Sequence, residues 1–123
     1  MERKKETKIE LPVEEIKNEI LGKQFELSFA FISKKESQYL NKTYRGKDES
    51  TDILSFPLEK NCGEILICKD IAKLKAPQFD KTLPEYLLFL VIHGCLHLKG
   101  LRHGSKMSKY ELQHYSRHRR RHL

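Results

Sequence analysis

The sequence predicts an α/β or α+β fold, with a small mixed four-stranded sheet packed against helices. Three observations support this prediction. The chain has 123 residues, which suits one domain and not two. Segments with alternating apolar residues and segments with helical spacing follow one another early in the chain, and helical segments close it. We therefore expect residues 1–123 to form a single domain.

The first elements are expected to be a strand, a helix and a second strand. Polar and apolar residues alternate over residues 7–11, which predicts a first strand. Apolar residues recur at helical spacing over residues 12–21, and Gly22 is expected to end this helix. Phenylalanine and leucine occupy alternate positions over residues 25–32, as in a strand with one buried face.

The middle of the chain predicts a helix and two strands. Ser33 and Glu36 have the spacing of a capping box, which places a helix over about residues 34–44. Two short strands are expected over residues 52–56 and 63–68, joined by a loop. The sheet is therefore expected to be completed in the first 68 residues.

Helices dominate the remainder of the sequence. A short helix is expected over residues 70–76. Thr82 and Glu85 form a second capping box, and the apolar helix that they begin is expected to run to about Lys99. A last, polar helix is predicted over residues 105–117.

Composition excludes several classes of protein. The longest apolar run, residues 86–92, is too short to span a bilayer, and residues 1–6 are not followed by the apolar stretch of a secretory signal. The three cysteines, Cys62, Cys68 and Cys95, are odd in number and form no CxxC pair. An odd number of cysteines favours reduced thiols, so we expect a cytoplasmic protein. The absence of a CxxC pair excludes a zinc-ribbon or thioredoxin-type motif.

Positive charge is concentrated at the C-terminus. The formal net charge is +7, and residues 102–123 supply +6 of it through seven basic residues and one acid, Glu111. Such a segment attracts polyanions. The alternative is that residues 117–123 form a solvated basic tail with no binding role.

Three histidines form the most informative pattern. His93 and His97 are four residues apart on the predicted apolar helix, so both imidazoles lie on one side of it. Gly100 allows the chain to reverse and bring His103 back toward this pair. Three imidazoles with an open fourth position are typical of catalytic zinc sites. We therefore predict one Zn²⁺ per chain; the alternative, two core histidines and a surface one, would bury imidazoles without partners.

The histidine spacing is similar to the metalloprotease pattern H-E-x-x-H-x-x-G-x-x-H, with one important difference. Gly94 occupies the position of the glutamate that serves as general base in those proteases. This substitution argues against proteolysis and favours another substrate, or a base from elsewhere. Cys95 is expected to be a small core residue, because it points away from His93 on a helix.

Two further motifs complete a resemblance to a known family. Residues 45–57 match R-G-K-D-x-x-T-D-x-L-S-F-P, and residues 63–68 match G-[DE]-I-x-I-C. With H-G-x-L-H-x-x-G-x-x-H at residues 93–103, these motifs span about half of the chain. The chain thus resembles the YbeY family of bacterial metal-dependent endoribonucleases, which are ribosomal RNA maturation factors. Taken alone, residues 45–57 would fit a capped polar loop equally well.

The resemblance implies a fold, an activity and a set of site residues. It implies zinc held by His93, His97 and His103, cleavage of single-stranded RNA, and a part in processing the 3′ end of 16S ribosomal RNA. The family's functional arginine corresponds to Arg45. Candidate partners are ribosomal RNA and ribosome or small-subunit assembly proteins. Basic residues outside the motif core are candidate RNA contacts: Lys47, Arg117, Arg119, Arg120 and Arg121.

The sequence departs from the family pattern at two positions. Arg102 stands where the family usually has an aspartate before the third histidine, and Gly104 stands where an acid is common. Such an acid could orient a histidine ligand. Its loss implies either weaker metal binding or another residue in the same role.

The chemistry of individual side chains also fits the cleavage of a phosphodiester. The guanidinium of Arg45 is a planar fork that matches two phosphate oxygens. Thr51, Asp52 and Ser55 are expected to shape the wall of the cleft, and Asp48 and Glu64 are candidate bases. Two other functions remain open: a non-enzymatic ribosome-assembly factor with structural zinc, and a metallohydrolase acting on a substrate other than RNA.

Overall fold

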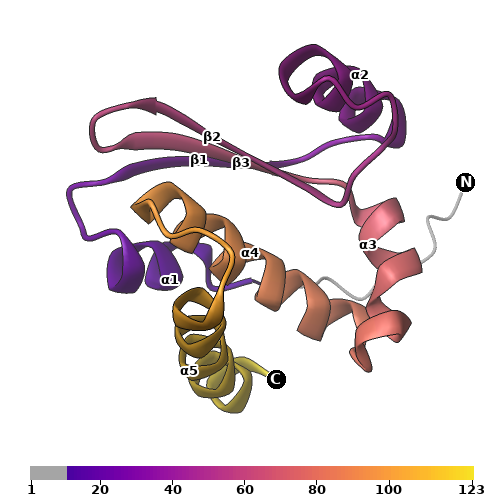
Figure 1. The fold of residues 1–123 in the computed structure, drawn as a ribbon. Coiled ribbons are helices and arrows are strands. Elements are labelled where there is room, and N and C mark those ends of the chain that lie inside the picture. The colour runs from indigo at the N-terminus through magenta and orange to yellow at the C-terminus, as the bar shows by residue number, and fades with distance from the viewer. Residues whose placement is uncertain (1–10) are drawn as a thin grey trace, which may run out of the picture.

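The computed structural model describes residues 11–123 and contains a sheet with helices on both of its faces (Figure 1). The elements in chain order are α1 (Val13–Ile20), β1 (Glu26–Phe31), α2 (Lys34–Arg45), β2 (Ile53–Glu59), β3 (Cys62–Ile67), α3 (Lys69–Lys75), the 3₁₀ helix η1 (Ala76–Phe79), α4 (Leu83–Lys99) and α5 (Ser105–His122). The predicted fold class is confirmed.

The sheet is mixed, as predicted, with strand order β1-β3-β2. β1 is parallel to β3, whereas β2 and β3 form an antiparallel hairpin. It has three strands within residues 11–123, so the prediction of four is one too many for this part of the chain. The strand predicted over residues 7–11 lies outside the described residues except for Leu11, which is not in a strand.

The hairpin is tighter than the sequence suggested. β2 continues through Pro57 to Glu59, where a loop was expected, and Asn61 turns the chain with a φ of 61°. Proline is tolerated because β2 is an edge strand and its pairing with β3 is irregular between Pro57 and Glu59. The proline was therefore a misleading signal for the end of the strand.

Helix α4 is the centre of the core. It packs against β2 and β3 on one side and against α1 and α5 on the other, and Figure 1 shows these three helices on the same side of the sheet. Leu87, Val91 and Ile92 are fully buried, as is Ile65 of β3. A helix that is apolar around most of its circumference is stable only when neighbours cover it on several sides. No helix within residues 11–123 has the length and apolarity needed to cross a membrane.

The predicted starts of α2 and α4 and the predicted end of α4 are confirmed. Ser33 with Glu36, and Thr82 with Glu85, form reciprocal capping boxes at the starts of α2 and α4. Gly46 and Gly100 follow these helices in the left-handed conformation; the φ of Gly100 is 104°.

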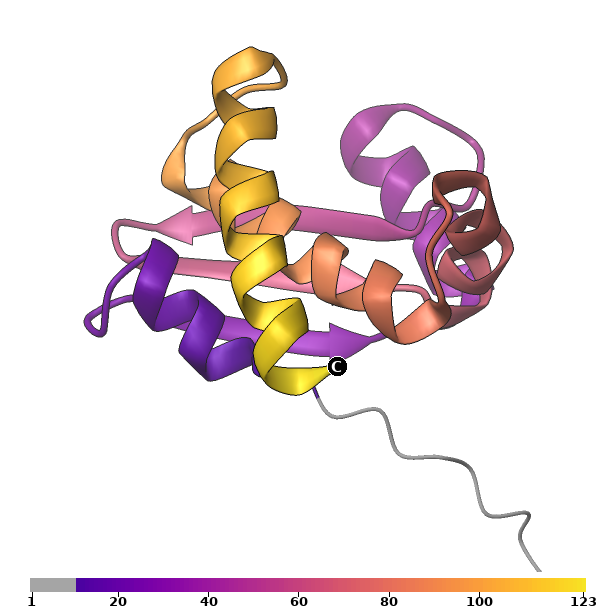
Figure 2. The ribbon, with the colours of Figure 1, turned by 90° about the horizontal axis from the view of Figure 1, so that it is seen from below.

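Helix α5 continues to His122, five residues beyond the predicted end at residue 117. Figure 2 shows it crossing the same side of the molecule as α1 and α4. Its last turns carry ion pairs to glutamates of α1, and these long-range contacts are absent from any local sequence pattern. Residues 117–122 are therefore helical and held against α1, although of these only His118 is buried.

The approach of α4 to the sheet depends on Gly94. A Cβ atom at this position would lie 2.8 Å from Cδ1 of Ile65 and 3.1 Å from Cδ1 of Ile53 and Oγ of Ser55. Even an alanine would therefore require the end of the Ile65 side chain to shift, and a bulkier side chain would crowd the contact between α4 and the sheet further.

Gly94→Val is expected to lower the free energy of unfolding by about 1–3 kcal/mol, because the added methyl groups overpack the contact between α4 and the sheet. Valine is the better helix former, so local propensity alone predicts the opposite sign. Urea denaturation measures the difference. A variant as stable as the original protein would show that Gly94 is not required for this packing.

Candidate metal centre

The structure brings His93, His97 and His103 together. Their ring centroids are separated by 4.6 Å (His93–His97), 5.2 Å (His93–His103) and 4.7 Å (His97–His103). One ring nitrogen from each lies within 4.8 Å of the other two. His93 and His97 occupy successive turns of α4, and the left-handed Gly100 turns the chain so that His103 returns to them.

This arrangement fits a metal ion. Nitrogen ligands about 2.0–2.1 Å from a tetrahedral Zn²⁺ lie roughly 3.3 Å apart, so small side-chain adjustments would complete the site. Burial lowers the pKa of His97, and the neighbouring His93 and His103 lower it further. A neutral imidazole is the form that binds a metal. Within residues 11–123 the group contains no fourth histidine, cysteine or carboxylate, which leaves room for a substrate or water.

Glu111 of α5 supplies a carboxylate to this centre. Its side chain contacts Nδ1 of His93 and is largely buried, with 12% exposed. A carboxylate on Nδ1 fixes the proton there and leaves Nε2 as the nitrogen available to a metal. The acid that Arg102 replaces in the family pattern thus has a counterpart in Glu111. In the sequence, Glu111 stands out only as the single acid of a strongly basic segment. That isolation was a usable sign of a specific partner for its carboxylate.

Arg45 and the three histidines line the same cavity, which has a volume of about 340 Å³. Arg45 is the last residue of α2, and residues around the start of β2, including Thr51, complete the wall. A cationic fork therefore faces the space next to the candidate metal ligands.

Hydrogen bonds hold this wall in place. The Thr51 backbone N–H donates to Oγ of Ser37 (2.8 Å), and the Ser37 hydroxyl donates to the Thr51 carbonyl (2.6 Å). The hydroxyl of Tyr86 donates to Oδ2 of the buried Asp52 (2.6 Å), which connects the start of β2 to α4. Burial, together with this bond, raises the pKa of Tyr86. Thr51 and Asp52 thus have the contacts of wall residues.

The two candidate bases are not placed at the centre. Ile65 faces Gly94 of α4, so its neighbour Glu64 projects from the opposite face of the sheet. Asp48 accepts a hydrogen bond from Gln38 and lies 3.9 Å from the Lys42 ammonium. Neither carboxylate lines the cavity.

The other basic candidates also lie outside the cavity. Lys47 is exposed beyond Gly46 and does not line it. Three arginines of α5 form ion pairs with glutamates of α1 and α4: Arg117 with Glu19, Arg119 with Glu85 and Arg121 with Glu15.

Arg120 forms no ion pair within residues 11–123; its Nε donates to the Ser116 carbonyl (3.3 Å). Arg117 is already about 18 Å from Ser105 along the helix axis. The structure therefore does not bring the C-terminal arginines to Arg45 and the histidines.

Known proteins are similar to this chain in sequence. A family model described as Endoribonuclease YbeY matches residues 2–122. The Endoribonuclease YbeY of Colwellia psychrerythraea is 41% identical over 99 residues, which cover 75% of this chain and 64% of that protein. The Endoribonuclease YbeY of Staphylococcus carnosus is 36% identical over 108 residues, 78% of this chain and 71% of the relative.

A solved structure agrees with these relatives. The solution structure of a protein from Thermotoga maritima aligns with a TM-score of 0.62 and 34% identity, over 84% of this chain and 73% of that one. The chain spans somewhat less than two thirds of the Colwellia relative's length. The family model nevertheless covers the chain almost from end to end, and all three motifs lie inside the match. The chain therefore belongs to the YbeY endoribonuclease family.

Proposed function

We propose that this protein is a zinc-dependent endoribonuclease that cleaves single-stranded RNA during ribosomal RNA maturation, including the 3′ end of 16S ribosomal RNA. The observation that carries the proposal is the shared cavity: Arg45 and the histidine triad line one space. The relatives' name, Endoribonuclease YbeY, supports RNA as the substrate.

Each side chain has a distinct role in this proposal. A Zn²⁺ held by the three histidines supplies Lewis-acid chemistry, which polarises a phosphoryl oxygen and makes water more acidic. The guanidinium of Arg45 binds two oxygens of the scissile phosphate and stabilises the charge that develops on them. Glu111 keeps the proton of His93 on Nδ1. Asp52, held by Tyr86, fixes the start of β2 and hence the wall opposite the histidines.

The cellular setting is part of the same proposal. We infer a cytoplasmic protein that acts with the ribosome or with small-subunit assembly proteins. Cys62, Cys68 and Cys95 are all free thiols, which suits a reducing compartment. A site with three histidine ligands and an open position favours catalysis over a structural zinc.

Arg45→Ala is expected to abolish most cleavage of a 5′-labelled single-stranded RNA, while the melting temperature and the zinc content stay unchanged. In this proposal the arginine acts on the phosphate; it is an exposed residue that lines the cavity, so its loss should leave the core intact. Arg45→Lys should restore only part of the rate, since a point charge cannot bind two oxygens in one plane. A duplex of the same sequence is the control substrate and should resist cleavage. Loss of the fold in Arg45→Ala, or full activity, would contradict this role.

Glu111→Gln is expected to weaken zinc binding at the histidine triad by roughly 10–100-fold, because the amide cannot hold the proton of His93 as a carboxylate does. Competition with a chromophoric chelator measures the affinity. Glu64→Gln makes the same chemical change on the other face of the sheet and should bind zinc like the original protein. Equal affinities for the two variants would remove Glu111 from the centre.

A further inference from the structure

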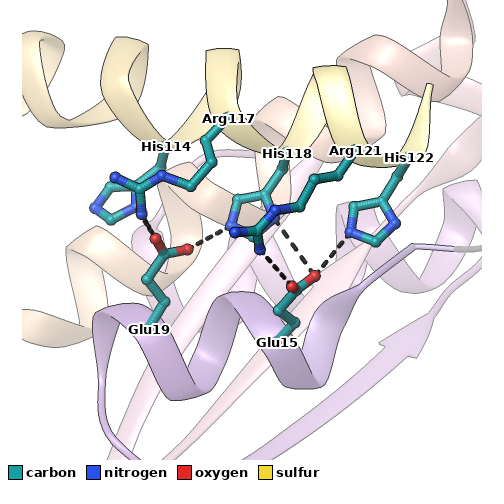
Figure 3. Close-up of polar contacts among 7 residues, drawn as sticks. All are labelled: Glu15, Glu19, His114, Arg117, His118, Arg121 and His122. Carbon is teal, nitrogen blue, oxygen red and sulfur yellow. Dashed lines mark hydrogen bonds and ion pairs between the residues drawn. The ribbon is translucent and has the colours of Figure 1, made fainter.

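A second group of histidines and glutamates lies where α5 packs on α1, outside the cavity described above (Figure 3). We name it the α1–α5 cluster; its members are Glu15, Glu19, His114, His118 and His122. His118 is its centre: its side chain is fully buried between the two helices. The proposed nuclease activity makes no use of these residues.

The two ring nitrogens of His118 have different surroundings. Nε2 lies 2.5 Å from Oε2 of Glu19. A carboxylate only accepts hydrogen bonds, so the proton is on Nε2 and this nitrogen is the donor. In the neutral ring Nδ1 then carries a lone pair. Nδ1 is buried and has no hydrogen-bond partner within residues 11–123. A buried acceptor without a partner is costly, which suggests that a ligand belongs there.

The group that Nδ1 faces is another acceptor. Oε2 of Glu15 lies 3.7 Å from it, beyond hydrogen-bond distance. The neutral imidazole is the form that binds a metal, and in that form Nδ1 presents its lone pair to this carboxylate oxygen. A lone pair and a carboxylate oxygen therefore face each other across a gap that a cation would fill.

A third ligand atom converges on the same place. His122 lies one turn beyond His118, with nearly parallel rings 6.0 Å apart, and its Nε2 is 2.7 Å from Oε2 of Glu15. Arg121 binds the other oxygen of Glu15 (2.6 Å) and so orients the carboxylate. Ligand atoms of Glu15, His118 and His122 all lie within 4.8 Å of one another. The His122 side chain is 34% exposed, which gives an ion access from solvent.

We propose that Glu15, His118 and His122 form a second metal site that joins α1 to the last turn of α5. Two imidazoles and one carboxylate favour a divalent first-row transition ion such as Zn²⁺, Co²⁺ or Ni²⁺ over Mg²⁺ or Ca²⁺. Glu19 holds the far nitrogen of His118, as Glu111 holds that of His93 at the first centre. The site is structural, because a metal there links residues about a hundred positions apart in the sequence.

Glu19, His114 and His118 form a competing ligand set in the same cluster. A metal there would take Nε2 of His118, which already binds Glu19, and would leave the buried Nδ1 without a partner. Nδ1 of His114 is also buried without a hydrogen-bond partner, but the His114 side chain is 16% exposed whereas His118 is fully buried, so the first set satisfies the more deeply buried nitrogen.

Zinc titration of a protein without its first centre tests the proposal. The parent is the full chain with His97→Ala and His103→Ala, without an affinity tag and stripped of metal. Calorimetry with Zn²⁺ should give one equivalent, and Co²⁺ should give visible d–d absorption from a nitrogen-containing site. The test does not depend on the first centre being catalytic.

Four single changes to this parent test the proposed ligands, the carboxylate behind them and a control position. His122→Ala and Glu15→Gln should each abolish the equivalent, and the former lies at a half-exposed helix end where circular dichroism should show an intact fold. Glu19→Gln should weaken binding by roughly 10–100-fold. His114→Gln is the matched control and should bind normally. Absence of binding by the parent, binding that survives both His122→Ala and Glu15→Gln, or binding that is lost in His114→Gln would each overturn the proposal.

Discussion

The rest of the structure depends on how closely α4 approaches the sheet. This helix must bury apolar side chains on several sides while it directs His93 and His97 into a cavity. Gly94 makes this compatible, because a side chain there would collide with Ile65 and Ile53. The metalloprotease glutamate is thus replaced by a residue that lets the helix lie close to the sheet.

Helix α5 provides the polar counterpart of this packing. Glu111 contacts His93, whereas His118 receives the carboxylate of Glu19 from α1. The two histidines each have one ring nitrogen held by a buried or half-buried carboxylate, which is the arrangement that prepares the other nitrogen for a metal. Three of the four arginines at the end of α5 form ion pairs with glutamates of α1 and α4, so most of this positive charge is already paired within the protein.

Local features of the site could be predicted from the sequence, and distant ones could not. Capping boxes, the left-handed Gly100 and the convergence of three histidines follow from spacings of a few residues. The contact of Glu111 with His93 spans 18 positions and that of Arg121 with Glu15 spans 106, and no periodicity encodes either. Pro57 wrongly suggested the end of a strand. A strand can contain proline when it lies at the edge of the sheet, and the sequence does not show which strand that is. Arg45 lines the cavity and Lys47 does not, because the chain turns at Gly46 between them.

The central claim is that the three histidines hold the metal on which RNA cleavage depends. Single-turnover cleavage of a labelled single-stranded RNA by metal-stripped protein, with Zn²⁺ then added in steps, tests it most directly. We expect no cleavage without metal. Cleavage should recover when Zn²⁺ is added to the original protein, and it should not recover in His97→Ala at the same zinc concentration. Undiminished cleavage by the stripped protein, or equal recovery in His97→Ala, would contradict it.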